Sequence, residues 1–289
     1  MKKLVLAALT GALVLTAGCQ KKVRDLSDVS EASGDADSTG GEDTTVDVAT
    51  IASVDDLPRE IIVDEDYLKA EVTIDEAVFS KAPAIGMDLV ENAQIRIEAM
   101  TTDAQEYQKA DPTYFRPYGL RIKWGIVAEA SNIVSLEGFH YTFTGGAHGN
   151  YFTAGRLYNG VTGEPMRLST FLREPQAAIK GHMDTVWTEI ARQKVKKSGN
   201  VSDLERFRSE AMELVSADMV LASEVNFVPS DVPNKFGGYT IHFAPYDIGS
   251  YAEGSYHVTI PQSTFRDAVK QQYLALFDGE PMAVERLGE

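Results

Sequence analysis

The chain has 289 residues, a formal net charge of −16 and a single cysteine. The excess of acids argues against nucleic acid as a partner, because phosphates need Lys and Arg to neutralise them, and against peripheral binding to anionic lipid. One cysteine cannot form an internal disulfide, so the folded part must be held together by an apolar core, which a chain of this length can build.

The N-terminus is typical of an export signal. Two lysines precede an apolar run over residues 4–17, which is shorter than the ~20 residues that span a bilayer. The run leads into Leu-Thr-Ala-Gly-Cys, which resembles a bacterial lipobox with Thr16 where leucine is usual. We expect residues 1–18 to be a lipoprotein signal peptide and Cys19 to be lipidated; an ordinary signal peptide with an incidental cysteine is the alternative. Gln20 favours the outer membrane, as in the Gram-negative lipoproteins that this chain resembles.

Residues 19–57 are rich in Ser, Gly, Thr and Asp, and from Asp25 onward they contain acids but no Lys or Arg. Such a segment buries too little apolar surface to offset its ordering entropy. We interpret it as an acidic, disordered tether between the lipid and the folded part. A specific acidic ligand for another protein is the alternative.

The first half of the folded part alternates between strands and one long helix. Residues 84–106 follow a helical period, with one apolar face formed by Leu89, Ala93, Ile97 and Met100. Pro112 and Pro117 end that helix. Alternating apolar residues predict strands over residues 68–74, 120–128, 139–143 and 151–159, and a turn over residues 160–163.

The second half begins with helices and returns to strands. Pro175 suits a first helical position, and the apolar face of that helix is Ile179, Met183, Val186 and Ile190. Lys194, Lys196 and Lys197 lie at its C-terminal end, where cations are favoured. Ser202 and Glu205 predict a capping box for a helix whose inward residues are Phe207, Ala211, Leu214 and Val215. Strands follow over residues 224–228, 239–243 and 256–260, with a helical turn near Thr264.

This order of elements lacks a regular β-α alternation. It predicts an α+β protein in which a mostly antiparallel sheet is packed with helices. We expect two intimately associated subdomains, one over residues 58–168 and the other over residues 169–289.

The familiar catalytic signatures are missing from the sequence, including the Gly-x-Ser-x-Gly elbow, the Ser-x-x-Lys pair and the His-Glu-x-x-His helix. We therefore predict no catalytic residue and no cofactor. Three histidines, His140, His242 and His257, fall on the polar phase of predicted strands, and His148 lies in a Gly-rich loop. If the strands are neighbours, the imidazoles could converge on a metal; otherwise they are separate, solvated side chains. We predict no metal site.

Two loops carry the residues best suited to recognition. The first, around residues 145–151, contributes Gly145, Gly146, His148, Asn150 and Tyr151. The second contributes Tyr246, Asp247 and Tyr251. Loops at strand ends usually carry recognition residues, and tyrosine supplies rigid amphipathic contact area. These eight residues are the predicted ligand-binding site. The alternative is that the glycines only turn the chain and that the tyrosines complete the core. For Tyr246, Tyr251 and Tyr256, a further alternative is that the rings cap the sheet edge and donate their hydroxyls to the backbone.

Three blocks resemble a known family. They are Tyr-x-x-x-Gly-Gly-Ala-His at residues 141–148, the run from Tyr158 to Leu172, and the segments Asn226-Phe227 and Ile241 to Pro261. The chain is similar here to paired envelope lipoprotein domains of unknown function. The same domains resemble the extracellular part of the lysozyme-binding anti-sigma factor and the N-terminal accessory region of a peptidoglycan N-acetyl deacetylase. One departure is Gly149 after His148, where the family commonly has proline.

The resemblance implies binding near the cell wall and supplies no established catalytic residue. Our leading hypothesis is a non-enzymatic envelope lipoprotein that binds peptidoglycan glycan or a basic wall-active protein such as lysozyme. The alternatives are a peptidoglycan-modifying hydrolase or deacetylase-like enzyme and a structural or assembly lipoprotein. In each case we expect the protein on the periplasmic face of the envelope, held to the membrane by a lipid anchor, with no nucleic acid as partner.

Overall fold

The computed structural model describes residues 57–288, all of which belong to one compact unit of the chain. The expected signal peptide, Cys19 and all of the acidic segment except Leu57 lie outside the described residues. Within residues 57–288, no helix is both long enough and apolar enough to cross a membrane.

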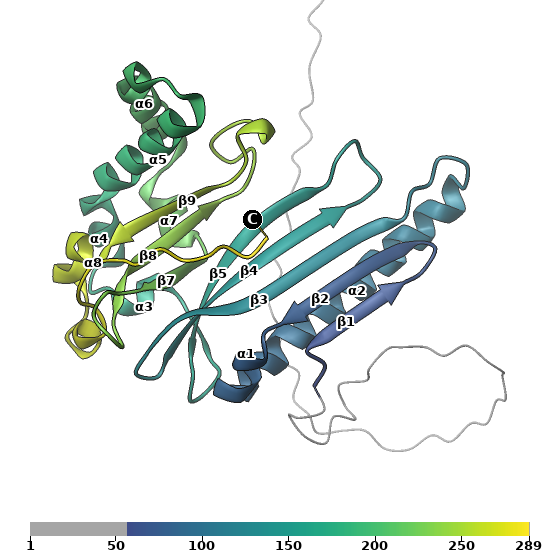
Figure 1. The fold of residues 1–289 in the computed structure, drawn as a ribbon, viewed down its shortest axis with the longest axis horizontal. Helices are drawn as coiled ribbons and strands as arrows, with labels where there is room; N and C mark the ends of the chain where they lie inside the picture. Colours follow the sequence, from purple (N-terminus) through teal and green to yellow (C-terminus); the bar gives the residue numbers. More distant parts are fainter. Residues whose placement is uncertain (1–56, 289) are drawn as a thin grey trace, which may run out of the picture. The chain divides into compact units, whose positions relative to one another are not determined.

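The first half of the unit is a six-stranded sheet in chain order (Figure 1). Its strands are β1 (Glu60–Asp64), β2 (Leu68–Ile74), β3 (Tyr118–Ala130), β4 (Ile133–Phe143), β5 (Asn150–Asn159) and β6 (Pro165–Met166). Every neighbouring pair is antiparallel except β2 and β3, which are parallel. A parallel pair needs a crossover, and helices α1 (Glu76–Lys81) and α2 (Pro83–Ala110) provide it.

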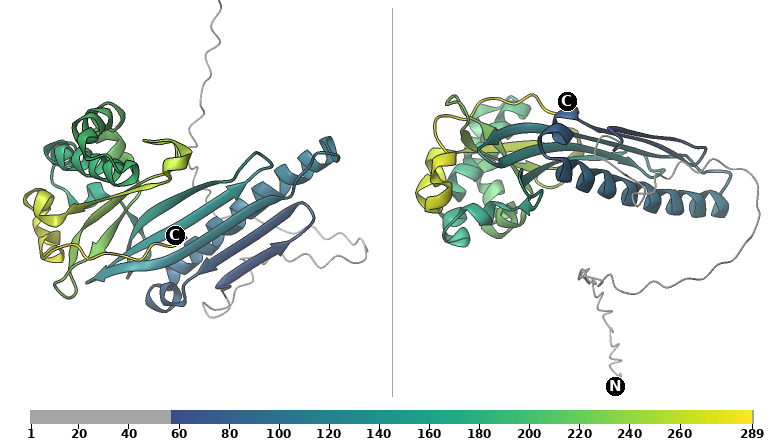
Figure 2. Two further views of the ribbon diagram at one scale, coloured as in Figure 1. Left: turned by 45° about the horizontal axis from the view of Figure 1, so that its top comes forward. Right: turned by 90° about the horizontal axis from the view of Figure 1, so that it is seen from below.

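Helix α2 covers one face of this sheet, as the view from below in Figure 2 shows. The core between them contains Leu89 and Ala93 of α2 and Leu120, Ile122 and Trp124 of β3. Successive strand residues point to opposite faces. The side chains of the intervening residues therefore lie on the second face of the sheet, which α2 leaves open. The helix ends at Ala110, two residues before Pro112.

The second half packs helices on a three-stranded antiparallel sheet of β7 (Val225–Pro229), β8 (Phe236–Phe243) and β9 (Tyr256–Pro261). The helices are α3 (Leu168–Phe171), α4 (Pro175–Gly181), α5 (Met183–Ser198), α6 (Leu204–Leu214), α7 (Ala217–Ala222) and α8 (Gln262–Phe265). Short 3₁₀ turns cover Val201–Asp203, Tyr251–Glu253, Arg266–Ala268 and Gln271–Leu276. The predicted α+β class, with a mostly antiparallel sheet and two associated subdomains, is confirmed.

The two sheets meet along a close seam between β5 and β7. Gly155 lies so near β7 that a Cβ atom there would be 2.3 Å from the backbone nitrogen of Asn226. Beside it, the hydroxyl of Ser135 on β4 donates to the carbonyl of Phe227 over 2.8 Å. Ile133 and Leu157 of the first sheet also join the core of the second half. The seam fixes the ends of β4 and β5 relative to the second sheet.

Several local expectations were wrong. The helix begun at Pro175 breaks at His182 into α4 and α5. The Ser202–Glu205 capping box does not form, because the Asn200 side chain accepts from the Ser202 N–H and a 3₁₀ turn precedes α6. Leu214, expected to point inward, is 46 % exposed. Strands β1 and β6 and the short helices α1, α3 and α7 were not predicted.

Four buried histidines make the fold sensitive to acid. Burial lowers the pKa of His140 to about 3 and of His182 and His257 to about 4, and the pKa of His242 lies well below its usual value for the same reason. Above pH ~6.5 these rings are neutral in both the folded and the unfolded chain. As the pH falls below that, the unfolded chain takes up protons that the folded chain refuses.

We therefore expect the free energy of unfolding to be steady above pH ~6.5 and to fall as the pH drops toward 4, each histidine contributing about 1.4 kcal/mol per pH unit. Urea titrations at a series of pH values measure this slope. His140→Phe removes one titrating group and should reduce the slope by about 1.4 kcal/mol per pH unit. The substitution breaks no hydrogen bond, because neither ring nitrogen of His140 has a partner within the described residues. An unchanged slope in that variant, or equal stability at pH 7 and pH 5 in the parent, would contradict the assignment.

Candidate functional site

The two predicted recognition loops come together in the structure. One loop joins β4 to β5 and the other joins β8 to β9. The ring of His148 stacks on the ring of Tyr251 with centroids 4.0 Å apart. The Tyr251 hydroxyl donates to the carbonyl of Gly149 over 2.8 Å, and the Tyr246 hydroxyl lies 3.5 Å from Nε2 of His148. Residues about 100 positions apart in sequence thus form one surface.

Tyr251 lies at the centre of this cluster. Its ring centroid is 5.5 Å from that of Tyr246 and 6.0 Å from that of Tyr151. Tyr151 in turn lies 6.2 Å from Phe139 on the neighbouring strand. These distances are those of stacked and edge-to-face aromatic pairs. The rings support one another and remain partly exposed, with Tyr246 the most exposed at 61 %.

The turn that carries Tyr246 is held in a strained conformation. Tyr246 has a φ of +80°, which is uncommon for a residue with a bulky side chain. The Asp247 carboxylate holds the turn by accepting from the Ala244 N–H over 2.7 Å. Such strain persists only where the surroundings enforce it, and it is concentrated at binding and catalytic sites. Asp247 therefore acts in shaping the loop that presents Tyr246.

The first loop depends on a close backbone approach at Gly149. A Cβ atom at this position would lie 2.3 Å from the ring of Tyr141, so any larger residue would push that ring aside. Gly146 is different, because its nearest neighbour would be a backbone oxygen 3.9 Å away. Gly145 has a φ of +88°, and Asn150 is exposed opposite Thr142 at the start of β5.

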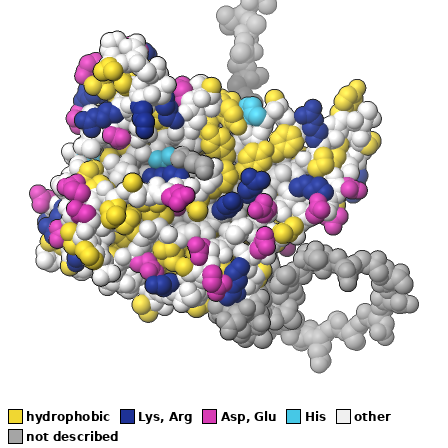
Figure 3. Space-filling model, viewed as in Figure 1, with side chains coloured by type: hydrophobic (Ala, Val, Ile, Leu, Met, Phe, Trp, Pro, Cys, Tyr) yellow, Lys and Arg dark blue, Asp and Glu magenta, His cyan; other side chains and the backbone are white. Residues whose placement is uncertain are grey.

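The loops continue onto the open face of the first sheet. Tyr141 pairs with Tyr151 across β4 and β5, and Phe139 lies two residues from Tyr141 on the same face. All three are partly exposed. We define the aromatic face as Phe139, Tyr141, His148, Tyr151, Tyr246 and Tyr251. In Figure 3, hydrophobic side chains gather over this part of the molecule, between the first sheet and the β8–β9 loop.

Basic residues border the aromatic face on β3. Arg121 is in register with Tyr141, and Lys123 is in register with Phe139. Arg121 is also 3.5 Å from Glu71 on β2, whereas Lys123 has no ion pair within the described residues. This open sheet face therefore presents rings and cations side by side, although the chain as a whole is acidic.

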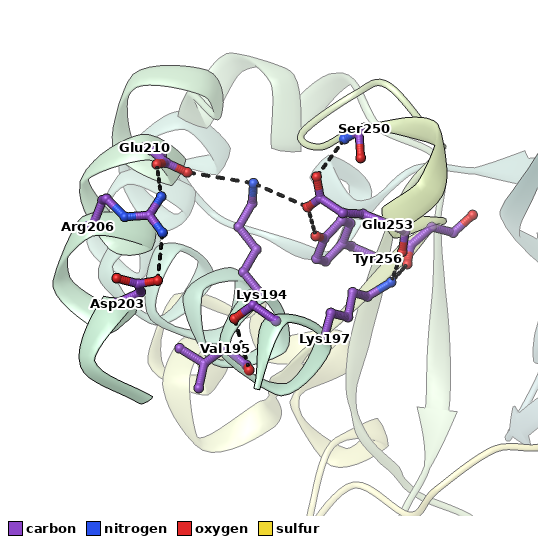
Figure 4. A network of polar contacts seen from close by, with 11 residues as sticks. Lys194, Val195, Lys197, Asp203, Arg206, Glu210, Ser250, Glu253 and Tyr256 are labelled. Atoms are coloured by element: carbon purple, nitrogen blue, oxygen red, sulfur yellow. Dashed lines mark hydrogen bonds and ion pairs between the residues drawn. The ribbon is translucent and has the colours of Figure 1, made fainter. Parts of the chain in front are cut away.

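A polar network behind the β8–β9 loop fixes the 3₁₀ turn Tyr251–Glu253 (Figure 4). The Glu253 carboxylate accepts from the Ser250 N–H over 2.8 Å and from the Tyr256 hydroxyl. Partial burial acts to raise the pKa of Glu253, but these hydrogen bonds outweigh it and hold the pKa at about 2. Lys197 donates to the carbonyls of Glu253 and Ser255. Tyr251 is thus carried on a turn that is tied down from its other side.

His140, His242 and His257 neither converge on a metal site nor lie as separate, solvated side chains. His140 does not lie on the polar face; its ring stacks on Phe152 in the core, with centroids 4.6 Å apart. His242 and His257 face each other with their Nδ1 atoms 2.8 Å apart, and the His242 side chain is 2 % exposed. They are a buried pair rather than solvated side chains. Within residues 57–288, no group of His, Cys, Asp or Glu is arranged to hold a metal ion.

Tyr256 also differs from the exposed-looking aromatics around it. It is fully buried, and burial raises the pKa of its hydroxyl above its usual range. Tyr256 therefore belongs to the core, and its hydroxyl donates to the Glu253 carboxylate and not to the backbone, whereas the Tyr251 hydroxyl does donate to a backbone carbonyl.

Other polar groupings were not foreseen from the sequence. Glu137, in the interior beside His242, is paired with Arg286 from the C-terminal segment, and Leu287 donates its N–H to the same carboxylate.

A cavity of about 370 Å³ lies where α2, β5 and the start of β7 meet. In it, Tyr158 donates to Asp88 over 2.8 Å and accepts from Arg156. Only the two-residue spacing of Arg156 and Tyr158 on one strand face could have indicated it.

The comparisons with known proteins bear on both halves. The family model described as "Deacetylase PdaC" matches residues 63–151, and the model described as "Protein of unknown function (DUF3298)" matches residues 180–263. The chain thus carries the two regions in tandem, as in a cell-wall-related family of unknown function, and the resemblance seen in the sequence is confirmed. The aromatic face takes one loop from each matched region.

Solved structures similar to this chain include two members of the DUF3298 family. A DUF3298-family member from Bacteroides fragilis NCTC 9343 is 16% identical, with a TM-score of 0.47, over 75% of this chain and 95% of its own. A DUF3298-family protein from Pseudomonas aeruginosa PAO1 is 20% identical, with a TM-score of 0.46, over 79% of this chain and 100% of its own. No curated protein matches the chain.

Gly149 and Gly146, which lie three residues apart in the first loop, provide a matched test of its packing. Gly149→Ala should destabilise the protein by about 1–3 kcal/mol, because the added methyl overlaps the Tyr141 ring. Gly146→Ala should change stability by less than about 0.5 kcal/mol, as surface changes do. Chemical denaturation measures both. Equal effects of the two substitutions would contradict the described packing of Tyr141 on Gly149.

Proposed function

We propose that this protein, which combines a PdaC-type region with a DUF3298 region, is a non-enzymatic envelope protein that binds the glycan strands of peptidoglycan through the aromatic face. The observation that carries the proposal is the meeting of His148 with Tyr251. It unites rings from both family regions on one accessible surface. Recognition residues carried on loops above a rigid sheet are the usual arrangement of a binding site.

The chemistry of the aromatic face suits a sugar chain. Aromatic rings offer flat apolar area to the C–H faces of pyranose rings, and tyrosine hydroxyls add directed hydrogen bonds at the ring edge. The exposed His148 and Asn150 and the amide of Gly146 supply further polar groups beside the rings. A ligand site needs this combination of apolar contact and a few placed polar groups.

The charge around the aromatic face favours peptidoglycan over a basic protein. Arg121, which is paired with Glu71, and Lys123, which has no ion pair within the described residues, border the rings. Peptidoglycan strands carry carboxylates that the Lys123 ammonium attracts. A lysozyme-like protein would instead meet these cations with its own positive surface. The remaining acidic surface serves solubility.

Location forms part of the same proposal and is supported by the sequence alone. We place the protein on the periplasmic face of the outer membrane, held by a lipid on Cys19 and separated from it by the acidic segment. Cys19→Ala should abolish labelling by radioactive palmitate and release the protein from membranes. If the variant still sediments with membranes after a salt wash, the lipid anchor is not what holds it.

Binding should depend on the tyrosines of the aromatic face and not on exposed tyrosine in general. Tyr251→Ala and His148→Ala should each weaken capture by purified sacculi about tenfold, or roughly 1.4 kcal/mol. His148→Ala should cost less than about 1 kcal/mol of stability. Tyr251→Ala removes a hydrogen bond and several ring contacts and should cost about 1–3 kcal/mol, so capture is measured under conditions where the variant is folded. Tyr114, which is 76 % exposed in the α2–β3 loop, supplies the control, and Tyr114→Ala should bind as the parent does.

Three results would overturn the proposal. Normal capture by both aromatic-face variants would place the site elsewhere. Capture of lysozyme without capture of sacculi would replace the glycan by a protein ligand. Release of new muropeptides or acetate from sacculi, lost in a single-residue variant, would make the protein an enzyme.

A further inference from the structure

Lys194 is a largely buried cation that is paired with two carboxylates and forms no direct hydrogen bond within the described residues. Its side chain is 7 % exposed, and its ammonium lies 3.8 Å from Glu210 and 3.7 Å from Glu253 (Figure 4). Both separations are too long for hydrogen bonds, and the ammonium forms none within residues 57–288. By contrast, the nearby Lys197 donates to two backbone carbonyls. The ammonium also lies 5.7 Å from the centre of the Phe207 ring and 5.8 Å from that of Tyr256, which stabilises the charge while its N–H donors stay available.

The ammonium of Lys194 faces a cavity of about 570 Å³ between α5, α6 and the 3₁₀ turn Tyr251–Glu253. We call it the lysine cavity; it is lined by Lys194, Lys197, Ser198, Arg206, Phe207, Glu210, Ala252 and Glu253. The volume lies within the range of roughly 300–1,000 Å³ found for ligand pockets. The lining combines cations, carboxylates, a hydroxyl and one aromatic wall.

This lining selects among ligand classes. An anion that approached Lys194 would be repelled by Glu210 and Glu253, and a cation that approached the carboxylates would be repelled by the lysines. A neutral hydroxyl has neither problem, because its oxygen accepts from the ammonium while its proton is donated to a carboxylate. A polyhydroxylated ligand can make several such paired bonds at once.

We propose that the lysine cavity is a second saccharide subsite, in which ligand hydroxyls bridge Lys194 to Glu210 and Glu253. This inference rests on the proposed glycan-binding function. The 3₁₀ turn joins the two surfaces, since Tyr251 belongs to the aromatic face while Ala252 and Glu253 line the lysine cavity. A glycan strand that lies on the aromatic face and passes over this turn enters the cavity.

The experiment compares short and long oligomers of N-acetylglucosamine by isothermal titration calorimetry. Lys194→Met should weaken binding of the hexamer about tenfold and leave binding of the dimer, which occupies only the aromatic face, unchanged. Glu210→Gln keeps the shape of the side chain and should weaken hexamer binding in the same direction, so the test survives if Lys194→Met does not fold. Glu213→Gln, on the same helix and exposed, is the matched control and should bind both oligomers normally.

The possible results distinguish failure of the proposed subsite from failure of the proposed function. Hexamer binding that is weakened by Tyr251→Ala but unchanged by Lys194→Met and Glu210→Gln would overturn the subsite and leave the function standing. Such a result would mean that water alone satisfies Lys194. Absence of binding of either oligomer to a parent protein that captures sacculi would overturn the subsite and leave the function standing, whereas absence of binding to both oligomers and sacculi would overturn both. Equal loss of dimer and hexamer affinity in the Lys194 and Glu210 variants would also overturn the subsite, since it would indicate a general disturbance of the loop.

Discussion

The close packing of β5 on β7 is the constraint on which the rest of the structure depends. At Gly155 the two backbones approach so closely that no side chain fits between them. The hydroxyl of Ser135 locks the same seam by bonding to the backbone of Phe227. With the strands fixed there, the β4–β5 loop and the β8–β9 loop extend from the seam toward each other, and His148 comes to rest on Tyr251. The aromatic face is therefore a product of both family regions, and neither region contains it alone.

Polar groups around the β8–β9 loop, which are partly or fully exposed, add a second layer of support. The carboxylate of Glu253 and the two backbone bonds from Lys197 hold the turn that carries Tyr251. Asp247 holds the strained backbone before it. Because these groups lie behind the rings, the rings are presented in fixed positions before a ligand arrives. A preorganised site of this kind avoids part of the ordering cost that binding otherwise imposes.

The sequence allowed most strands and the long helix to be predicted, because alternation and helical periodicity report burial directly. It also led to the prediction of eight recognition residues, since glycine and tyrosine clusters at strand ends are typical of recognition loops; the two loops do meet, and the role of these residues in binding stays a prediction. What it could not supply were the contacts made across the fold. The burial of His140 depends on which face of β4 is covered by α2, and its polar character suggested the opposite face.

Contacts across the fold also decided which charged side chains are buried and which helix caps form, and the sequence did not indicate these contacts. Lys194 was expected at a helix end, where cations are favoured, but α6 and the Tyr251–Glu253 turn enclose it. The Ser202–Glu205 pattern was outweighed by Asn200, which offered an earlier cap. The pairing of Glu137 with Arg286 joins residues 149 positions apart, so no local pattern could have indicated it.

The central claim is that sugar rings lie on the aromatic face where the two family regions meet. Intermolecular nuclear Overhauser effects between an N-acetylglucosamine tetramer and the purified protein test this most directly. The account predicts contacts from the sugar ring protons to the aromatic protons of both Tyr141 and Tyr251, which belong to different halves of the chain. Contacts confined to one half, or a bound tetramer with no contact to either ring, would contradict it.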